Sequence, residues 1–276
     1  MTNTIDGAET IMTMTPNGAA PISEYLARIE QDSAPRPTAG ALRVLQRAHL
    51  MHVPFDTIDT YLTRHEDLDP RAVTERIVNQ RRGGTKSQLN VGFAVLLHGL
   101  GYMVDLVLAQ SSSPRLRRAE SHLALIVATA GSRFLVDVSG ELSDEPLAIG
   151  ASATQLDTAG TFALSTTMGP LLEVSAPGDR HYTISAVTPA SSGRGPRSIA
   201  GRDRPKGLHA ATVLPALSIR RERGRTTLME GRLIETVGTA RTDITVAPAS
   251  LRQIVEERFG FVPTTSRLAA LAGPKR

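Results

Sequence analysis

The strongest constraint on the fold is a change in hydrophobic period near Gly101. Before this point, apolar residues recur every three to four positions, which is typical of amphipathic helices. After it, segments such as YMVDLVLAQ, HLALIVATA and RFLVDVSG are rich in leucine and β-branched residues, as strands are. The sequence therefore predicts an α+β fold in which a helical N-terminal third is followed by a mostly β segment.

Four N-terminal segments carry helix start and stop signals. In the first, SEYLARIEQ, Ser23 is the expected N-cap, and in the third, DPRAVTERIVNQ, Asp69 caps a helix with Pro70 in its first turn. The second, TAGALRVLQRAHLMH, should end at Pro54, because proline cannot continue a helix. The fourth starts near Lys86 and should stop at the glycines of HGLG.

Two segments are predicted to lie outside regular structure. Residues 1–21 form an expected flexible leader, and residues 189–207, PASSGRGPRSIAGRDRPKG, have the composition of a linker or mobile loop. Beyond the linker we expect further strands and a terminal helix, PASLRQIVEERFG, with Ser250 as its cap.

Composition excludes several classes of function. The chain has no cysteine, which rules out disulfides, thiolate metal sites and a cysteine nucleophile. It has no long apolar run and no basic, apolar N-terminal leader, so we expect a cytoplasmic protein without a membrane partner. Aromatic residues are only 4%, too few for a nucleic-acid reader, although the net charge of +4 is compatible with a small anionic ligand.

Three polar residues are candidates for chemistry: Lys86, which opens a helix, His122, which begins a strand, and Asp137, which is expected inside another strand. The two strands should pair as a hairpin around Ala130 and Gly131, which brings His122 and Asp137 close in register. A buried carboxylate needs a partner, and a His–Asp pair is the orienting half of a nucleophilic triad.

An ordered set of motifs resembles the arylamine N-acetyltransferase family, which includes the amide synthases that close ansamycin macrolactams. RRGGTKSQLN resembles the family's RGGxCxExN motif, SHLALIV its H-x-x-L strand and FLVDVSG its DVGFG-type strand. Upstream, HLMHVPFDTIDTYL resembles HLxxIPFENLD, and the likeness covers roughly residues 22–272.

The resemblance implies an architecture with a cysteine-protease-like core. This expected architecture comprises a helical domain at 22–100, a β-barrel domain at 101–190, and a linker with an α/β lid at 191–276. It also implies acyl thioester donors, usually acetyl-CoA, amine or hydrazine acceptors, and a ping-pong mechanism through a Cys–His–Asp triad. Carried over by motif, the histidine is His122, the aspartate is Asp137, and the cysteine falls on Lys86.

Lysine cannot replace the cysteine in that route, because an acylated lysine is a stable amide. The helix dipole and burial would favour a neutral Lys86, able to act as a general base or to form a Schiff base. A nearby Asp137 would instead favour a fixed cation that holds an oxyanion or blocks the site. The sequence leaves these alternatives open.

Three functions follow. The first is an enzyme that acts on a natural-product intermediate by condensation, cyclisation or acyl transfer, with Lys86, His122 and Asp137 in its cleft. The second is an inactive protein that binds a ligand or partner, and the third is direct acyl transfer with His122 as base. We expect a small-molecule substrate and no required cofactor or metal. An acyl-CoA or an acyl carrier protein thioester would serve as donor, and a homodimer is compatible with the sequence.

Overall fold

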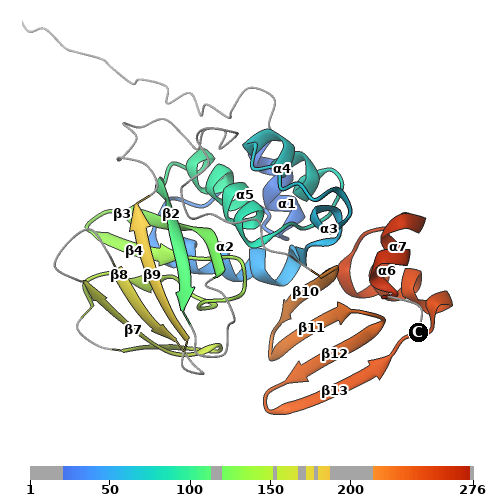
Figure 1. The fold of residues 1–276 in the computed structure, drawn as a ribbon. Helices are drawn as coiled ribbons and strands as arrows, with labels where there is room; N and C mark the ends of the chain where they lie inside the picture. The colour runs from blue at the N-terminus through green and yellow to red at the C-terminus, as the bar shows by residue number, and fades with distance from the viewer. Residues whose placement is uncertain are drawn as a thin grey trace, which may run out of the picture.

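The computed structural model describes residues 21–112, 120–151, 154–166, 172–176, 180–186 and 214–273. In these ranges a cluster of helices is followed by a large antiparallel sheet and then by a smaller sheet with two helices (Figure 1). The predicted α+β class and β-barrel are confirmed, because the large sheet is curved and nearly closed. The predicted leader (apart from Pro21), the linker and the C-terminal three residues lie outside the described residues.

Among the described residues, the helical part consists of five helices and one short strand. The cap predicted at Asp69 is confirmed: its carboxylate accepts from the backbone N–H groups of Arg71 and Ala72. The cap predicted at Ser23 is wrong, because the first helix already begins at Ile22, after Pro21. The elements are α1 (Ile22–Arg28), α2 (Ala39–His52), β1 (Phe55–Asp56), α3 (Ile58–Thr63), α4 (Pro70–Val78) and α5 (Lys86–Gly99).

Helix α5 is the centre of the molecule. Every residue from Ser87 to Leu97 is buried, and the helix packs against strands β2 and β3 as well as α4. A helix that is apolar on all sides can be stable only inside a core. The N-terminus of α5 is thereby held against the large sheet.

The large sheet has eight strands in the order β5-β4-β3-β2-β9-β8-β7-β6, all antiparallel. One of its faces packs on the helices, and the other encloses a separate apolar core around Phe162 and Tyr182. The strands are β2 (Met103–Ser112), β3 (Glu120–Thr129), β4 (Ser132–Val136), β5 (Leu147–Ala148), β6 (Gln155–Asp157), β7 (Gly160–Thr166), β8 (Leu172–Ala176) and β9 (Arg180–Ala186).

The C-terminal sheet has the order β1-β10-β11-β12-β13, so its first strand comes from the helical part of the chain. The predicted terminal helix is present but is not the last, because a second helix follows it. The remaining elements are β10 (Ala216–Arg221), β11 (Gly224–Met229), β12 (Arg232–Val237), β13 (Ala240–Thr245), a 3-10 turn (Pro248–Ser250), α6 (Leu251–Phe259) and α7 (Thr265–Leu271).

A partly buried charge network fastens the last helix to the helical part. Asp59 accepts hydrogen bonds from Arg76 at 2.6 Å and from Arg267 of α7 at 2.9 Å, and Arg82 bonds both Asp59 and Asp56. Burial alone would raise the pKa of Asp59, but the hydrogen bond from Arg267 and the charges of Arg82 and Arg76 hold it well below its ordinary range. No helix in the described ranges is long and apolar enough to cross a membrane.

Candidate functional site

The site forms where the N-terminus of α5 meets strand β3. Thr85 caps the helix through a capping box: its hydroxyl accepts from the N–H of Gln88, whose side chain accepts from the N–H of Thr85. Gly83 and Gly84, just before the cap, let the backbone pass close to neighbouring atoms. A Cβ at Gly83 would lie 1.5 Å from the carbonyl oxygen of Pro54, so only glycine fits there. Because Thr85 is the N-cap, Lys86 is the first residue of α5, as the sequence predicted.

His122 and Asp137 are brought together by the expected hairpin between β3 and β4, in which Thr129 pairs with Ser132. His122 Nε2 lies 2.9 Å from Asp137 Oδ2, and the two side chains are 3% and 1% exposed. One detail of the prediction is wrong: Asp137 does not lie inside a strand but directly follows β4, which ends at Val136. The backbone is released from the ladder there, which lets the carboxylate turn toward β3.

Asp137 is held by more than the imidazole. Its Oδ1 accepts from Asn90 Nδ2 at 2.8 Å and from the N–H of Ser139 at 2.7 Å, and its Oδ2 also accepts from the Ser139 hydroxyl at 2.9 Å. Burial raises the pKa of Asp137, but His122, Asn90 and Ser139 more than offset this and lower it to about 2. The carboxylate is therefore ionised and fixed in orientation.

Lys86 has different partners from those expected. Its ammonium lies 2.8 Å from Glu120 Oε2 and 3.4 Å from Glu141 Oε1, and its side chain is 21% exposed. Among the described residues no hydrogen bond or ion pair joins it to His122 or Asp137. The expectation that Asp137 would act on Lys86 is wrong, because Asp137 is already fully engaged with groups from α5, β3 and its own turn.

The electrostatic surroundings keep Lys86 charged. Burial lowers the pKa of Lys86, but the carboxylates of Glu141 and Glu120 outweigh burial and raise it above its ordinary value. A protonated amine has no lone pair, so it is neither a base nor a nucleophile near neutral pH. Of the two alternatives left open by the sequence, the geometry favours the fixed cation.

The hydroxyls beside Lys86 have structural partners. Ser87 is 3% exposed, and its Oγ accepts from the N–H of Leu123 at 3.2 Å, which ties α5 to β3. The Thr85 hydroxyl donates to Glu66 while it caps the helix. Neither hydroxyl is hydrogen-bonded to His122 within the described part of the chain.

Comparison with known proteins shows the family to which this chain is related. A family profile described as N-acetyltransferase matches residues 38–266. The chain belongs to the arylamine N-acetyltransferase family. The resemblance found in the motifs is thereby confirmed, and because the chain has no cysteine it is a divergent member that lacks the family's nucleophile.

Curated relatives match in part of their length. The arylamine N-acetyltransferase / N-hydroxyarylamine O-acetyltransferase of Salmonella typhimurium is 31% identical over 144 residues, which are 51% of each chain. The arylamine N-acetyltransferase of Mycolicibacterium smegmatis is 30% identical over 50% of this chain and 53% of its own. An N-malonyltransferase of Gibberella moniliformis is 29% identical over 41% of this chain and 35% of its own. The chain spans about half the length of the first two relatives it matches.

Solved structures share the fold over nearly their whole length. The M. smegmatis arylamine N-acetyltransferase has a TM-score of 0.73 at 24% identity and covers 92% of this chain and 99% of its own. The Mycobacterium marinum enzyme in complex with CoA has a TM-score of 0.73 at 23% identity, over 91% of this chain and 98% of its own. At this identity the likeness concerns the fold alone.

Four residues of this site were not singled out from the sequence: Asn90, Glu120, Ser139 and Glu141. Asn90 carried a signal, since it is a polar residue one helical turn after Lys86 in an otherwise apolar run. The two glutamates reach Lys86 from β3 and from the turn after Asp137, so no local pattern joins them to it.

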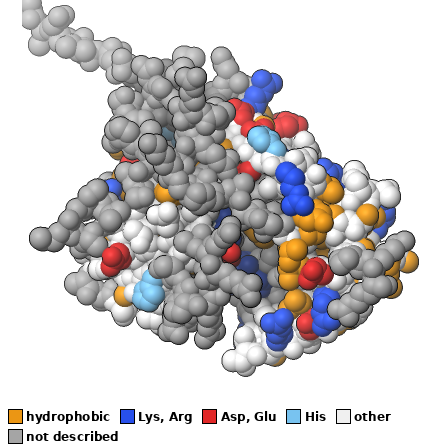
Figure 2. All heavy atoms as spheres, viewed as in Figure 1, with side chains coloured by type: hydrophobic (Ala, Val, Ile, Leu, Met, Phe, Trp, Pro, Cys, Tyr) orange, Lys and Arg blue, Asp and Glu red, His pale blue; other side chains and the backbone are white. Residues whose placement is uncertain are grey.

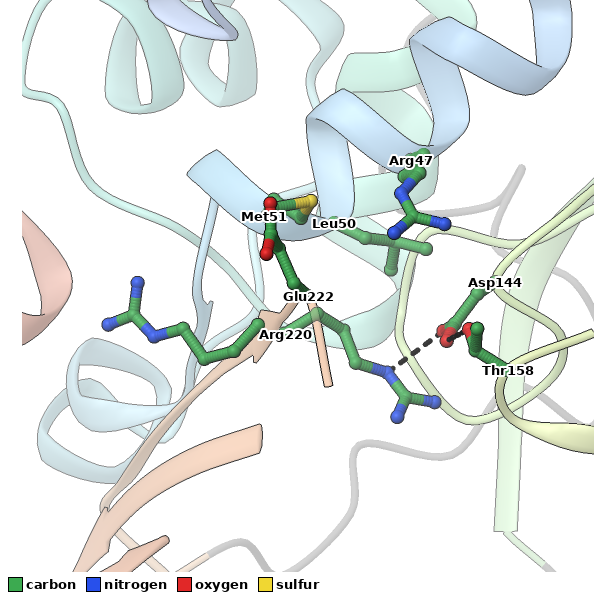
Figure 3. A pocket seen from close by; sticks show the side chains of 8 residues that line it. Arg47, Leu50, Met51, Asp144, Thr158, Arg220 and Glu222 are labelled. Atoms are coloured by element: carbon green, nitrogen blue, oxygen red, sulfur yellow. Dashed lines mark hydrogen bonds and ion pairs between the residues drawn. The ribbon is translucent and has the colours of Figure 1, made fainter. Parts of the chain in front are cut away.

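Residues from the C-terminal sheet hold the turn that carries Glu141. Arg225 donates to the carbonyl oxygen of Gly140, and Arg220 forms a 2.9 Å ion pair with Asp144. Figure 3 shows this ion pair at the edge of a shallow hollow that Arg47 also lines. The C-terminal sheet thus positions one wall of the site. In the part of the chain that the structure describes, no group of three or more His, Asp or Glu residues is placed to hold a metal ion.

Proposed function

We propose that this protein transfers an acyl group from a bound thioester directly to an amine, without a covalent acyl-enzyme, with His122 as the general base. The observation that carries the proposal is the buried His122–Asp137 pair at 2.9 Å, with Asp137 fixed by Asn90 and Ser139. A pair of this kind orients an imidazole for proton transfer whether or not a thiol is present.

In this reaction the acceptor nitrogen attacks the thioester carbonyl while His122 takes its proton. The C–N bond forms, the C–S bond breaks, and the proton held by His122 goes to the departing thiolate. Negative charge develops on the carbonyl oxygen, and a fixed cation is suited to stabilise it. The two ion pairs of Lys86 account for two of the three N–H donors of its ammonium, and the third is the donor proposed for the carbonyl oxygen.

The substrate class is proposed from the comparisons and from the family resemblance. A family member has been solved with CoA, which supports a CoA thioester as donor, and a carrier-protein thioester has the same reacting group. The malonyl-transferring relative supports an acyl group other than acetyl. We propose an amine of natural-product origin as the acceptor, which includes intramolecular acceptors in a condensation or cyclisation.

The test compares His122→Gln with Lys86→Met. Purified protein is incubated with acetyl-CoA or malonyl-CoA and a panel of arylamines, hydrazines and aliphatic amines, and free thiol and amide are both measured. We expect transfer by the native protein, a loss of about 100-fold or more for His122→Gln, and a smaller loss for Lys86→Met. Intact-mass spectrometry should show no acyl adduct. An acyl or borohydride-trapped adduct on Lys86, or full activity of His122→Gln, contradicts the proposal.

A second candidate is an inactive binding protein, and the ion pairs of Lys86 favour it, because they fill the nucleophile's position with a charged side chain. This function predicts thioester binding by calorimetry with no turnover for any amine. Lys86→Cys separates the two further. Acetylation of that variant at residue 86, followed by transfer to a hydrazine, would show that the cleft still supports acyl chemistry.

A further inference from the structure

The outer edge of the C-terminal sheet has properties that the site does not use. Strand β13 is the last strand of its sheet, and among the described residues no strand pairs with its other side (Figure 1). All six of its residues are exposed. Unpaired edges of this length are normally shortened, covered, or protected by proline or charged side chains, because their free backbone groups pair readily with another chain.

The backbone groups that β13 offers follow from its register with β12. Val246 donates its N–H to the carbonyl oxygen of Gly231 at 2.8 Å, one residue beyond the paired strands. Hydrogen-bonded and non-hydrogen-bonded pairs alternate along an antiparallel ladder. Ile244 and Thr242 therefore bond toward β12, and the N–H and C=O groups of Arg241, Asp243 and Thr245 point away from the sheet.

The side chains on this edge are self-complementary. If a second copy of β13 pairs antiparallel about a two-fold axis at Thr242, Arg241 of one copy lies opposite Asp243 of the other, and the reverse pair follows by symmetry. In that register Arg241 and Asp243 form the hydrogen-bonded pairs, which is what their outward backbone groups require. Opposite charges in directly facing positions stabilise a strand pair.

An apolar contact accompanies the charges. Ile244 is 54% exposed and pairs with Leu233 of β12, which belongs to the core under α6 and α7. In the two-fold register Ile244 faces Ala240 of the other copy. Figure 2 shows basic, acidic and hydrophobic side chains close together in the lower right part of the view, where Figure 1 places this sheet.

We propose that β13 is a homodimer interface, in which two C-terminal sheets join edge to edge through Arg241–Asp243 cross-pairs. The occupant is a second copy of this chain, because the base and the acid on either side of Thr242 are complementary to themselves about a two-fold axis. A single strand pair is a small interface, so we expect a weak, reversible dimer.

Charge exchange tests the pairing. Arg241→Asp and Asp243→Arg each place like charges opposite one another, and each should raise the dimer dissociation constant by about tenfold or more. The double exchange R241D/D243R restores opposite charges and should restore the dimer. A mixture of the two single variants should form a heterodimer. Sedimentation velocity over a range of concentrations measures all four cases.

Controls keep a folding defect from imitating dissociation. Within one chain Asp243 already pairs with Arg232 at 2.9 Å and with Arg241 at 3.8 Å, so the thermal unfolding of each variant is measured alongside. Arg252→Asp makes the same charge change on α6, where Arg252 pairs with Glu256, and should leave the dimer unchanged. A native protein that stays monomeric at its highest soluble concentration, or a dimer insensitive to both exchanges, overturns the proposal.

Cross-linking gives an independent measurement. Because the chain has no cysteine, Thr242→Cys introduces a single thiol, and at the two-fold axis it faces its own copy in a non-hydrogen-bonded pair. Such pairs have Cα atoms about 4.5 Å apart, within disulfide range. We expect a disulfide-linked dimer under mild oxidation, whereas Glu222→Cys, in the exposed β10–β11 turn, should cross-link slowly. Equal rates for the two variants contradict the register.

Discussion

The two sides of the candidate site are built differently. His122 and Asp137 are almost fully buried, and every bond of the Asp137 carboxylate goes to a group fixed by the core. Lys86 is partly exposed and pairs with two carboxylates whose side chains are 47% and 35% exposed. The His122–Asp137 pair is therefore part of the core, whereas Lys86 belongs to an ion cluster that is partly open to solvent. The proposed direct transfer uses the first and does not require the second to react.

The largest expected effect concerns Asp137. Asp137→Ala should lower the free energy of unfolding by about 3–5 kcal/mol, because it leaves buried partners unpaired. Glu141→Ala removes a carboxylate from the other side of the site, where exposure limits its contribution to about 1 kcal/mol or less. Urea denaturation followed by circular dichroism measures both. Equal losses of unfolding free energy in the two variants would contradict the difference between the buried His122–Asp137 pair and the Lys86 ion cluster.

Acid should reduce the stability that the buried Asp137 carboxylate contributes. The pKa of Asp137 is about 2 in the folded protein against an ordinary 3.8, so its stabilising contribution is present above that ordinary value and is lost as the pH falls toward 2. The difference corresponds to about 2 kcal/mol. The measurement is the free energy of unfolding against pH for native protein and Asp137→Asn. A loss of the same size in the variant would assign the effect to other carboxylates.

Asn90 should matter through Asp137. Asn90→Ala removes the 2.8 Å bond to the carboxylate and also the acceptor for the N–H of Val138, at a cost of about 1–3 kcal/mol. It should also raise the pKa of Asp137, which shifts the acid limb of the stability profile upward. If only stability changes and the acid limb stays in place, Asn90 supports the turn without orienting the carboxylate.

Lys86 should contribute little to stability. Lys86→Met should change the free energy of unfolding by about 1 kcal/mol or less, since the side chains of both partners are partly exposed to solvent. Its pKa is raised by folding, so the contribution is complete below the ordinary pKa and is lost only as the pH rises through the higher folded value. A large loss near neutral pH would instead show that Lys86 is a structural element of the core.

The smallest expected change is in the pKa of Lys86 itself. Glu141 is the strongest of the charges that raise it, so Glu141→Gln should lower that pKa without unfolding the protein. The chain has only three lysines, so NMR of the lysine side chains can follow each separately. Lys206 and Lys275 serve as internal references. An unchanged pKa in the variant would mean that Glu120 alone holds the ammonium.

The general order of helices before strands, the helix start at Lys86, the hairpin that brings His122 near Asp137, and the family could all be predicted from the sequence. These features depend on local signals: the period of apolar residues, a capping residue followed by a helical run, and motifs a few residues long. The short helices α3 and α7, of six and seven residues, were not predicted from the sequence.

The charge of Lys86 could not be predicted from the sequence, because it depends on the folded arrangement. Its partners come from positions 120 and 141, on different elements, and the turn that carries Glu141 is held by Arg225 from a third region of the chain. Asp137 was the nearest candidate in the motif order, but its oxygens are taken up by Asn90, Ser139 and His122. Ion pairs depend on distances in space between side chains far apart in sequence, and only folding sets those distances.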